Sequence, residues 1–182
     1  NPWERGFDYV LTIEGGLSHY FPYSTGGKNW MTSRNREYRL TEKYESSDDV
    51  GLLENLPEDT YLTDYFSERA VDFIQRNNDN PWFLFLSYNA PHSPLLAKDE
   101  DMVANSGIED FSRQKFAAMM TAVDRGVGSI INYLETNGDL SNTLIWFISD
   151  NGGPTSVNTS LNTPYTGYKG HVYEGGIEVP FI

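Results

Sequence analysis

The chain has 182 residues, contains no cysteine and carries a formal net charge of −13 at pH 7. The lack of cysteine excludes disulfides, thiolate metal sites and a cysteine nucleophile within this chain. The acidic balance disfavours nucleic acid as a partner, because phosphate binding needs a basic surface. Aromatic residues make up 14% of the chain, which predicts a folded domain. No apolar segment reaches the ~20 residues that span a bilayer, so we expect no membrane partner.

The first 59 residues predict mostly loop structure, because glycine and aromatic residues are scattered through polar sequence. A short apolar stretch, Tyr9–Ile13, predicts a strand. A pair of glycines ends this strand, and Ser18 and His19 follow. The weak alternation over Arg34–Tyr44 predicts a hairpin arm or an edge strand.

Two segments have the 3.6-residue period of an amphipathic helix, Thr60–Asn77 and Phe111–Asn137. The second contains Gly126 and Gly128, which each lower helix propensity by roughly 1 kcal/mol, so we expect close packing at both. Gly138 predicts the C-terminal cap. The apolar face expected for the longer helix consists of Phe116, Met119, Met120, Val123, Val127, Ile130, Ile131 and Leu134.

Two continuous apolar runs, Trp82–Tyr88 and Thr143–Ile148, predict strands that are buried on both faces. Each run follows one of the predicted helices along the chain. This alternation of helix and strand predicts an α/β fold with a largely parallel or mixed central sheet and flanking helices.

Polar side chains follow the carboxyl ends of both predicted strands. His92 lies in a proline-bounded loop after the first, and Asp150 and Asn151 follow the second. In open α/β sheets, ligands bind beyond the strand carboxyl ends, and the oxygens of Asp and Asn suit Ca²⁺ or Mg²⁺. Taken singly, these residues also fit a structural histidine and a plain Asp-Asn-Gly turn, just as Lys169 in its glycine-rich loop fits a solvated side chain.

Four motifs occur in a characteristic order and spacing. They are Asn89–Leu95 (NAPHSPL), Ala122–Gly128 (AVDRGVG), Ser149–Gly153 (SDNGG) and Lys169–Pro180 (KGHVYEGGIEVP). Together they resemble the sulfatase (arylsulfatase) family of the alkaline-phosphatase-like superfamily. The segment Arg5–Asp8 is similar to the family's segment after its early active-site lysine. The resemblance covers nearly the whole chain and implies the alkaline-phosphatase-like α/β fold.

The resemblance implies a role for each polar feature of the strand ends. Asp150 and Asn151 correspond to ligands of a divalent cation, usually Ca²⁺. His92 corresponds to the histidine near the leaving-group oxygen of the sulfate ester, and Lys169 to a lysine that contacts the sulfate. A compact anion whose hydrolysis develops charge on oxygen is well served by a cation, a lysine and a protonated histidine.

Ser18 and His19 correspond to a position that lines the pocket in some family members. The chain departs from the usual family pattern in two places. It has Thr166-Gly167-Tyr168-Lys169 where the family often has Arg-Gly-Gly-Lys, and Lys169-Gly170-His171 where the family often has Lys-Gly-Thr or Lys-Gly-Ser.

The family's nucleophile is a formylglycine made from cysteine or serine in a Cys/Ser-x-Pro/Ala-x-Arg motif, and this motif does not occur in the 182 residues. The resemblance therefore implies that residues 1–182 are part of a single sulfatase catalytic domain truncated at both ends, with the formylglycine in the missing N-terminal part. We expect the full-length enzyme to hydrolyse aryl or carbohydrate sulfates in the periplasm or outside the cell. We expect the 182-residue piece alone to be inactive and to bind Ca²⁺ weakly.

Two other functions remain open at this level. One is a phosphodiesterase, phosphonate hydrolase or phosphotransferase of the same superfamily, which would carry more metal ligands and an unmodified serine or threonine nucleophile. The other is a binding protein that keeps the fold without catalysis. The single Asp-Asn pair and the Asn-Ala-Pro-His motif favour the sulfatase.

Overall fold

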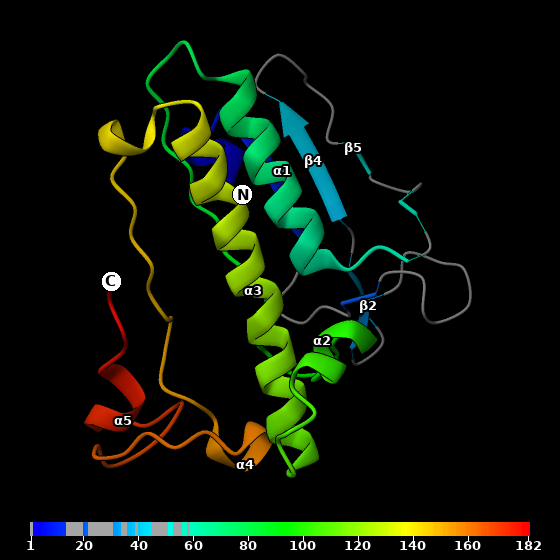
Figure 1. Ribbon diagram of the computed structural model, residues 1–182, viewed down its shortest axis with the longest axis vertical. Helices are drawn as coiled ribbons and strands as arrows, with labels where there is room; N and C mark the ends of the chain where they lie inside the picture. The colour runs from blue at the N-terminus through cyan, green and yellow to red at the C-terminus, as the bar shows by residue number, and fades with distance from the viewer. Residues whose placement is uncertain are drawn as a thin grey trace. The chain divides into compact units, whose positions relative to one another are not determined.

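The computed structural model describes residues 2–13, 20–21, 31–33, 36–38, 40–44, 51–52, 56–57 and 59–182. The chain divides into two compact units, Asn1–Phe66 and Ser67–Ile182 (Figure 1). Strands lie in the first unit and most of the helical residues in the second. No helix in the described ranges combines the length and the hydropathy that crossing a bilayer requires.

The described residues of the first unit include a short 3₁₀ helix and five strands. They are η1 (Pro2–Arg5), β1 (Tyr9–Ile13), β2 (Met31–Ser33), β3 (Arg36–Tyr38), β4 (Leu40–Tyr44) and β5 (Gly51–Leu52). Antiparallel pairing gives a three-stranded sheet in the order β1-β4-β5, while β2 and β3 form a separate hairpin. Both strand predictions for this region are confirmed, since β1 has the predicted bounds and the second region holds β3 and β4.

The β1–β4 ladder runs from the pair Tyr9 and Tyr44 to the pair Ile13 and Leu40. Val10 and Thr41 are buried on one face of this ladder and Leu40 is buried on the other, because successive side chains of a strand point to opposite faces. The Tyr9 hydroxyl donates to Glu42 Oε1 at 2.7 Å and ties the two strands together on the face that carries Leu40.

Helix α1 (Leu62–Arg76) confirms the first predicted helix to within two residues. Its buried apolar residues are Leu62, Phe66, Ala70 and Ile74, spaced four apart as in an amphipathic helix, and Thr63 and Ser67 are buried beside them. The start of the helix is tied to the first unit, because the backbone N–H of Leu62 donates to the carbonyl of Tyr20 at 2.9 Å.

The second unit is built around the long helix α3. Its elements are α2 (Asp99–Ala104), α3 (Phe111–Thr136), η2 (Leu140–Asn142), α4 (Thr155–Asn158) and α5 (Glu174–Ile177), besides most of α1. Helices α2 and α4 both contact α3, near the end where α3 begins (Figure 1). The sequence did not indicate α2, α4 or α5, because these helices are too short to show a 3.6-residue repeat of apolar residues.

Helix α3 confirms the second predicted helix, and both of its ends are capped. Asp110 Oδ1 accepts a hydrogen bond of 2.7 Å from the backbone N–H of Arg113 at the N-terminus. At the C-terminus, Gly138 has φ +80°. Gly138 and Asp139 donate to the carbonyls of Glu135 and Leu134 at 3.1 and 2.9 Å, which is a Schellman motif. The predicted glycine cap is therefore confirmed.

The two glycines inside α3 differ in their surroundings. A Cβ on Gly126 would lie 2.6 Å from the Tyr88 hydroxyl and would also strike the side chain of Ser67, so only glycine fits there. The Ser67 and Tyr88 hydroxyls share a hydrogen bond of 2.8 Å across this contact. A Cβ on Gly128 would meet nothing within 4 Å. Close packing is therefore confirmed at Gly126 and wrong at Gly128.

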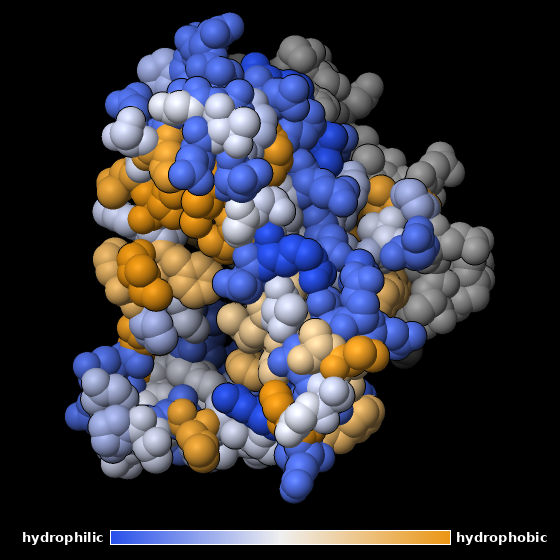
Figure 2. All heavy atoms as spheres, in the orientation of Figure 1, coloured by the Kyte–Doolittle hydropathy of each residue, from blue (hydrophilic) through white to orange (hydrophobic). Residues whose placement is uncertain are grey.

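The predicted burial of the two apolar runs is wrong in this structure. Residues 82–88 form no strand, and residues 143–148 carry only one antiparallel bridge, between Ile148 and Phe181. Phe83 is 74% exposed and Leu144 is 80% exposed. Figure 2 shows apolar side chains gathered over the left-hand trace that Figure 1 draws for the second run. The physical reason is pairing: a parallel strand is buried only between neighbouring strands, and the described ranges supply none for these runs.

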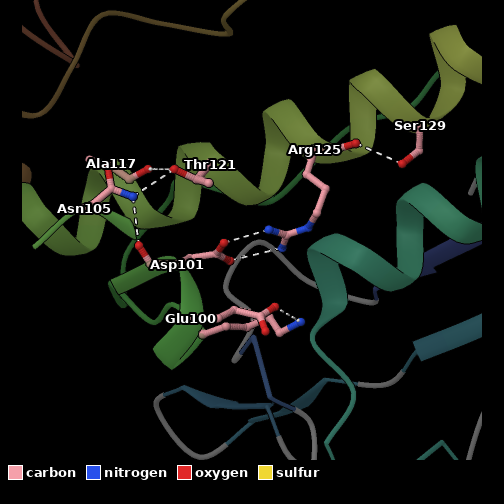
Figure 3. A network of polar contacts seen from close by, with 8 residues as sticks. Glu100, Asp101, Asn105, Ala117, Thr121, Arg125 and Ser129 are labelled. Carbon is pink, nitrogen blue, oxygen red and sulfur yellow. Dashed lines mark hydrogen bonds and ion pairs between the residues drawn. The ribbon is translucent and has the colours of Figure 1, made fainter. Parts of the chain in front are cut away.

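A polar network joins α2 to α3 (Figure 3). The Asp101 side chain, 4% exposed, receives two hydrogen bonds from the Arg125 guanidinium, at 2.7 and 3.1 Å. Beside it, Asn105 Nδ2 donates to the Asp101 carbonyl at 2.8 Å and to the Thr121 hydroxyl at 2.9 Å. Arg125 belongs to the Ala122–Gly128 motif, and this geometry assigns that part of the motif to helix packing.

Candidate functional site

The loop after the second apolar run, Ser149–Gly153, is fixed by hydrogen bonds to the segment at residues 176–180. The backbone N–H of Gly152 donates to the carbonyl of Gly176 at 3.0 Å, and that of Ser149 donates to Pro180 at 3.3 Å. Within the loop, the Ser149 hydroxyl donates to the Asn151 carbonyl at 3.0 Å. The backbone that carries Asp150 and Asn151 is therefore anchored on both sides.

The glycines of these two segments allow an unusually close approach of backbone to backbone. A Cβ on Gly152 would strike the carbonyl oxygen of Gly175 and lie 2.8 Å from its carbonyl carbon. A Cβ on Gly176 would lie 2.8 Å from the carbonyl oxygen of Tyr168. Gly175 and Gly176 are both buried at helix α5. Both glycine pairs that the sequence motifs contain are therefore required by packing.

Lys169 occupies a tight turn that brings it to the same place. The His171 N–H donates to the Tyr168 carbonyl at 2.9 Å, and Gly170 has φ +90°, the pattern of a type II turn with Lys169 at its first central position. The backbone N–H of Lys169 donates to the Gly153 carbonyl at 3.4 Å. The lysine turn and the Asp150–Gly153 loop are thus directly connected.

A residue that the sequence motifs did not indicate, Asn162, completes this connection. Its Oδ1 accepts from the Gly153 N–H at 2.9 Å, and its Nδ2 donates to the Gly153 carbonyl at 3.0 Å. The same Nδ2 also lies 3.3 Å from the Gly167 carbonyl. The carboxamide therefore bonds both the N–H and the carbonyl of Gly153, as a paired strand residue would. Its contact with the Gly167 carbonyl links Gly153 to the loop that carries Lys169. An asparagine in a loop gives no periodic signal, so sequence reasoning missed it.

The side chains at the centre of this arrangement have no partners within the described part of the chain. Asp150 is exposed, Asn151 and Lys169 are half-buried, and no hydrogen bond or ion pair engages their side-chain ends. Their oxygens and ammonium group are therefore available for a ligand. Backbone hydrogen bonds hold these loops in place, so the side-chain ends are not needed for anchoring and can bind a ligand.

The adjacent Asp150 and Asn151 fit a hard divalent cation in donor type but not in number. Ca²⁺ takes six to eight oxygen ligands in general, and these two residues supply only part of such a set. The described residues contain no cluster of three or more His, Cys, Asp or Glu side chains that would hold a metal by itself. The pair therefore fits as one portion of a larger site.

His92 lies in its own loop and is exposed. Its backbone N–H donates to the Asn89 carbonyl at 2.9 Å, and its ring Nδ1 lies 2.8 Å from the Ser93 carbonyl. Because a carbonyl oxygen only accepts, Nδ1 must carry the proton in this contact. Nε2 is then the ring nitrogen that can exchange a proton with a ligand. Ser18 and His19, the two remaining predicted site residues, lie outside the described residues.

The hydroxyl of Tyr165 lies near this region and is paired with Glu178. The hydrogen bond to the Glu178 carboxylate, together with its negative charge, raises the pKa of Tyr165 above its ordinary value. The phenol is therefore held in its protonated form, and it is not a candidate base at neutral pH.

The comparison with protein families decides the affiliation of the chain. The sequence model of the Sulfatase family matches residues 2–182. The chain belongs to the sulfatase family. It is 29% identical to the uncharacterized sulfatase YdeN of Escherichia coli over all of its own length, and 32% identical to arylsulfatase J of Mus musculus over 97% of it. It spans only 29% and 28% of the lengths of these two relatives.

Solved structures confirm the α/β, alkaline-phosphatase-like fold class that the motifs implied. A crystal structure of Ps i-CgsB in complex with k-i-k-neocarrahexaose matches the whole chain with a TM-score of 0.78 and 38% sequence identity. The chain covers 40% of that protein. The fold of the protein yidJ from Bacteroides fragilis is also similar, with a TM-score of 0.63 at 20% identity.

Proposed function

We propose that the whole sulfatase to which this chain belongs hydrolyses sulfate monoesters of carbohydrates. The observation that supports the proposal is the backbone hydrogen bond between the Asp150–Gly153 loop and the Lys169 turn, because it makes the loop with the Asp and Asn oxygens a neighbour of the turn with the lysine. Relatives named for carbohydrate substrates support it, since the chain is 27% identical to N-acetylgalactosamine-6-sulfatase of Mus musculus over 190 residues. The hexaose complex of Ps i-CgsB supports it further.

In the proposed site, Lys169 binds the sulfate group through the charge of its ammonium end. Asp150 and Asn151 would hold a divalent cation through their side-chain oxygens, Ca²⁺ in the first instance, with Mg²⁺ as the alternative. Such a cation, when bound, would stabilise the negative charge that develops on the sulfate oxygens. The acidic character of the chain does not oppose this, because local charge decides the potential of a small site.

His92 is proposed to act on the leaving group. Hydrolysis breaks the bond between sulfur and the ester oxygen, and that oxygen must receive a proton unless it leaves as a stable anion. With Nδ1 held by the Ser93 carbonyl, Nε2 of a protonated His92 would donate that proton. Sugar hydroxyls are poor leaving groups, so a carbohydrate sulfate depends strongly on this step.

The nucleophile is proposed to be a formylglycine in sequence that the 182 residues do not include, and the protein is proposed to act in the periplasm or outside the cell. Phosphoryl or phosphonate chemistry is the second candidate. It is not favoured, because the family match and the relatives named above are all sulfatases. Peptide mass spectrometry of the full-length protein distinguishes the two, since an unmodified serine or threonine nucleophile would support phosphoryl transfer.

The test of the proposed function is sulfate release by the full-length protein, measured by ion chromatography for two esters with different leaving groups. His92→Ala should reduce kcat for a sugar sulfate by about 10²-fold or more, and should reduce kcat for 4-nitrophenyl sulfate much less. The comparison works because 4-nitrophenolate leaves without protonation. Equal losses of kcat for both esters would contradict the proposed role of His92 at the leaving group. If the unmutated protein released sulfate from neither ester, the proposed function would be overturned.

A further inference from the structure

Three aromatic rings gather on the surface beside Lys169. The rings of Tyr168 and His171 have their centroids 3.9 Å apart at an angle of 39°, and Tyr173 meets His171 edge-on at 6.1 Å. Tyr168 is 44% exposed and Tyr173 is 57% exposed. We call these three side chains the aromatic platform. Tyr168 and Tyr173 are exposed and His171 is half-buried between them, so the three rings form one connected surface.

The local backbone fixes the platform relative to the lysine. The type II turn consists of Tyr168, Lys169, Gly170 and His171, so the lysine and the two stacked rings belong to one tight turn. His171 Nδ1 is buried and has no hydrogen-bond partner in the described chain; it faces Gly167, at whose position a Cβ would lie 3.4 Å away. Packing alone therefore holds this ring, at the cost of an unsatisfied nitrogen.

We propose that the aromatic platform stacks against the sugar ring of a sulfated carbohydrate whose sulfate is bound by Lys169. This inference rests on the proposed function and names the part of the chain that selects the substrate's sugar. Aromatic faces pack well against the apolar C–H faces of a pyranose, and binding sites combine such surfaces with a few placed charges. The platform and Lys169 provide this combination within six consecutive residues, 168–173.

A carboxylate next to the platform favours a sugar over a simple aryl group. Glu174 follows Tyr173, is exposed, and its carboxylate makes no hydrogen bond with any described residue. A sugar offers hydroxyl donors that a carboxylate accepts, while an aryl ring offers none.

The test measures binding to the full-length protein by isothermal titration calorimetry. The probes are inorganic sulfate, which reports on the charged site alone, and two sulfated sugars, k-i-k-neocarrahexaose and N-acetylgalactosamine 6-sulfate. The variants are Tyr168→Ala and His171→Ala, with His171→Phe to keep the ring and remove its nitrogens. Val172→Ala is the matched control, because Val172 lies in the same loop and is 84% exposed.

The proposal predicts that each alanine variant of the platform lowers affinity for the bound sugar about tenfold more than affinity for inorganic sulfate. His171→Phe should keep most of the sugar affinity, and Val172→Ala should change neither affinity. If the alanine variants lose sulfate and sugar affinity equally, or lose no sugar affinity, the proposed stacking is overturned. Binding of sulfate but of neither sugar by the unmutated protein also overturns it. Binding of nothing, sulfate included, would instead contradict the proposed function itself.

Discussion

The backbone N–H of Gly152 lies 3.0 Å from the carbonyl oxygen of Gly176 and donates to it. This single hydrogen bond joins two loops that come from separate motifs, one carrying Asp150 and the other following Lys169. No side chain stands between the two glycines, so any Cβ at Gly152 would force the loops apart. The relative position of the predicted metal ligand and the predicted sulfate-binding lysine therefore depends on glycine.

Gly152→Ala should disturb the site more than it disturbs the fold. The added Cβ would strike the Gly175 carbonyl, and relief of that clash requires the two loops to separate, at a cost of about 1–3 kcal/mol. We expect a large loss of sulfatase activity together with a lower unfolding temperature in the full-length protein. Gly107→Ala is the control, since a Cβ there meets nothing within 4 Å. A Gly152→Ala variant with normal activity would show that the loops do not need this contact.

Asn162→Asp tests the carboxamide that pairs with Gly153. The substitution keeps size and shape but replaces the Nδ2 donor with a second acceptor, so the Gly153 carbonyl loses the shorter of its two hydrogen bonds and faces a negative charge. Loss of such a partner costs about 1–3 kcal/mol. We expect reduced thermal stability and reduced kcat/KM. The control is Asn142→Asp, the same substitution at an exposed position. Equal behaviour of the two variants would remove Asn162 from the positioning role.

Helix α3 offers a matched pair of glycine substitutions two residues apart. Gly128→Ala adds a methyl group in open space and should stabilise the helix by about 0.5–1 kcal/mol through propensity. Gly126→Ala should destabilise the protein by about 1–3 kcal/mol, because the methyl group overlaps Ser67 and the Tyr88 hydroxyl. Urea denaturation measures both free energies of unfolding. Stabilisation by both substitutions would contradict the close approach at Gly126.

The Asp101–Arg125 pair should be among the most sensitive polar contacts of the second unit. Arg125→Met would leave a buried carboxylate without its two charge-assisted hydrogen bonds, which typically costs about 3–5 kcal/mol. Glu100→Gln is the contrasting control, since its ion pair with Lys98 is exposed and such pairs contribute less than about 1 kcal/mol. Chemical denaturation should separate the two variants clearly. Similar small losses would mean that Asp101 is adequately solvated without Arg125.

Elements with a local signal were predictable from the sequence. Helices α1 and α3 follow from their 3.6-residue period and β1 from its short apolar run. Elements that depend on contacts with distant parts of the chain were not predictable. The apolar runs 82–88 and 143–148 have the composition of central strands, but a strand also needs neighbours, and composition cannot state whether the described chain supplies them. Helix α2 was not predicted because it has only six residues and because Asp101 and Asn105 hold it to α3, a contact that no local pattern reveals.

The sequence motifs predicted which residues belong to the candidate site, but not the contacts that connect their loops. The motifs indicated Asp150, Asn151 and Lys169, and the structure connects their loops. It holds His92 by contacts with Asn89 and Ser93 in its own loop. The role of Asn162 depends on a contact nine residues away in a loop, which no local pattern reveals.

The most direct test of the central claim is a double-mutant cycle on sulfate release by the full-length protein, with Asp150→Ala, Lys169→Ala and the two combined. If both residues act in one sulfate-ester site, each single variant should lower kcat/KM by about 10²-fold or more, and the double variant should lose much less than the product of the two. Losses that multiply would show that the residues act independently, and normal activity in either single variant would contradict the site described above.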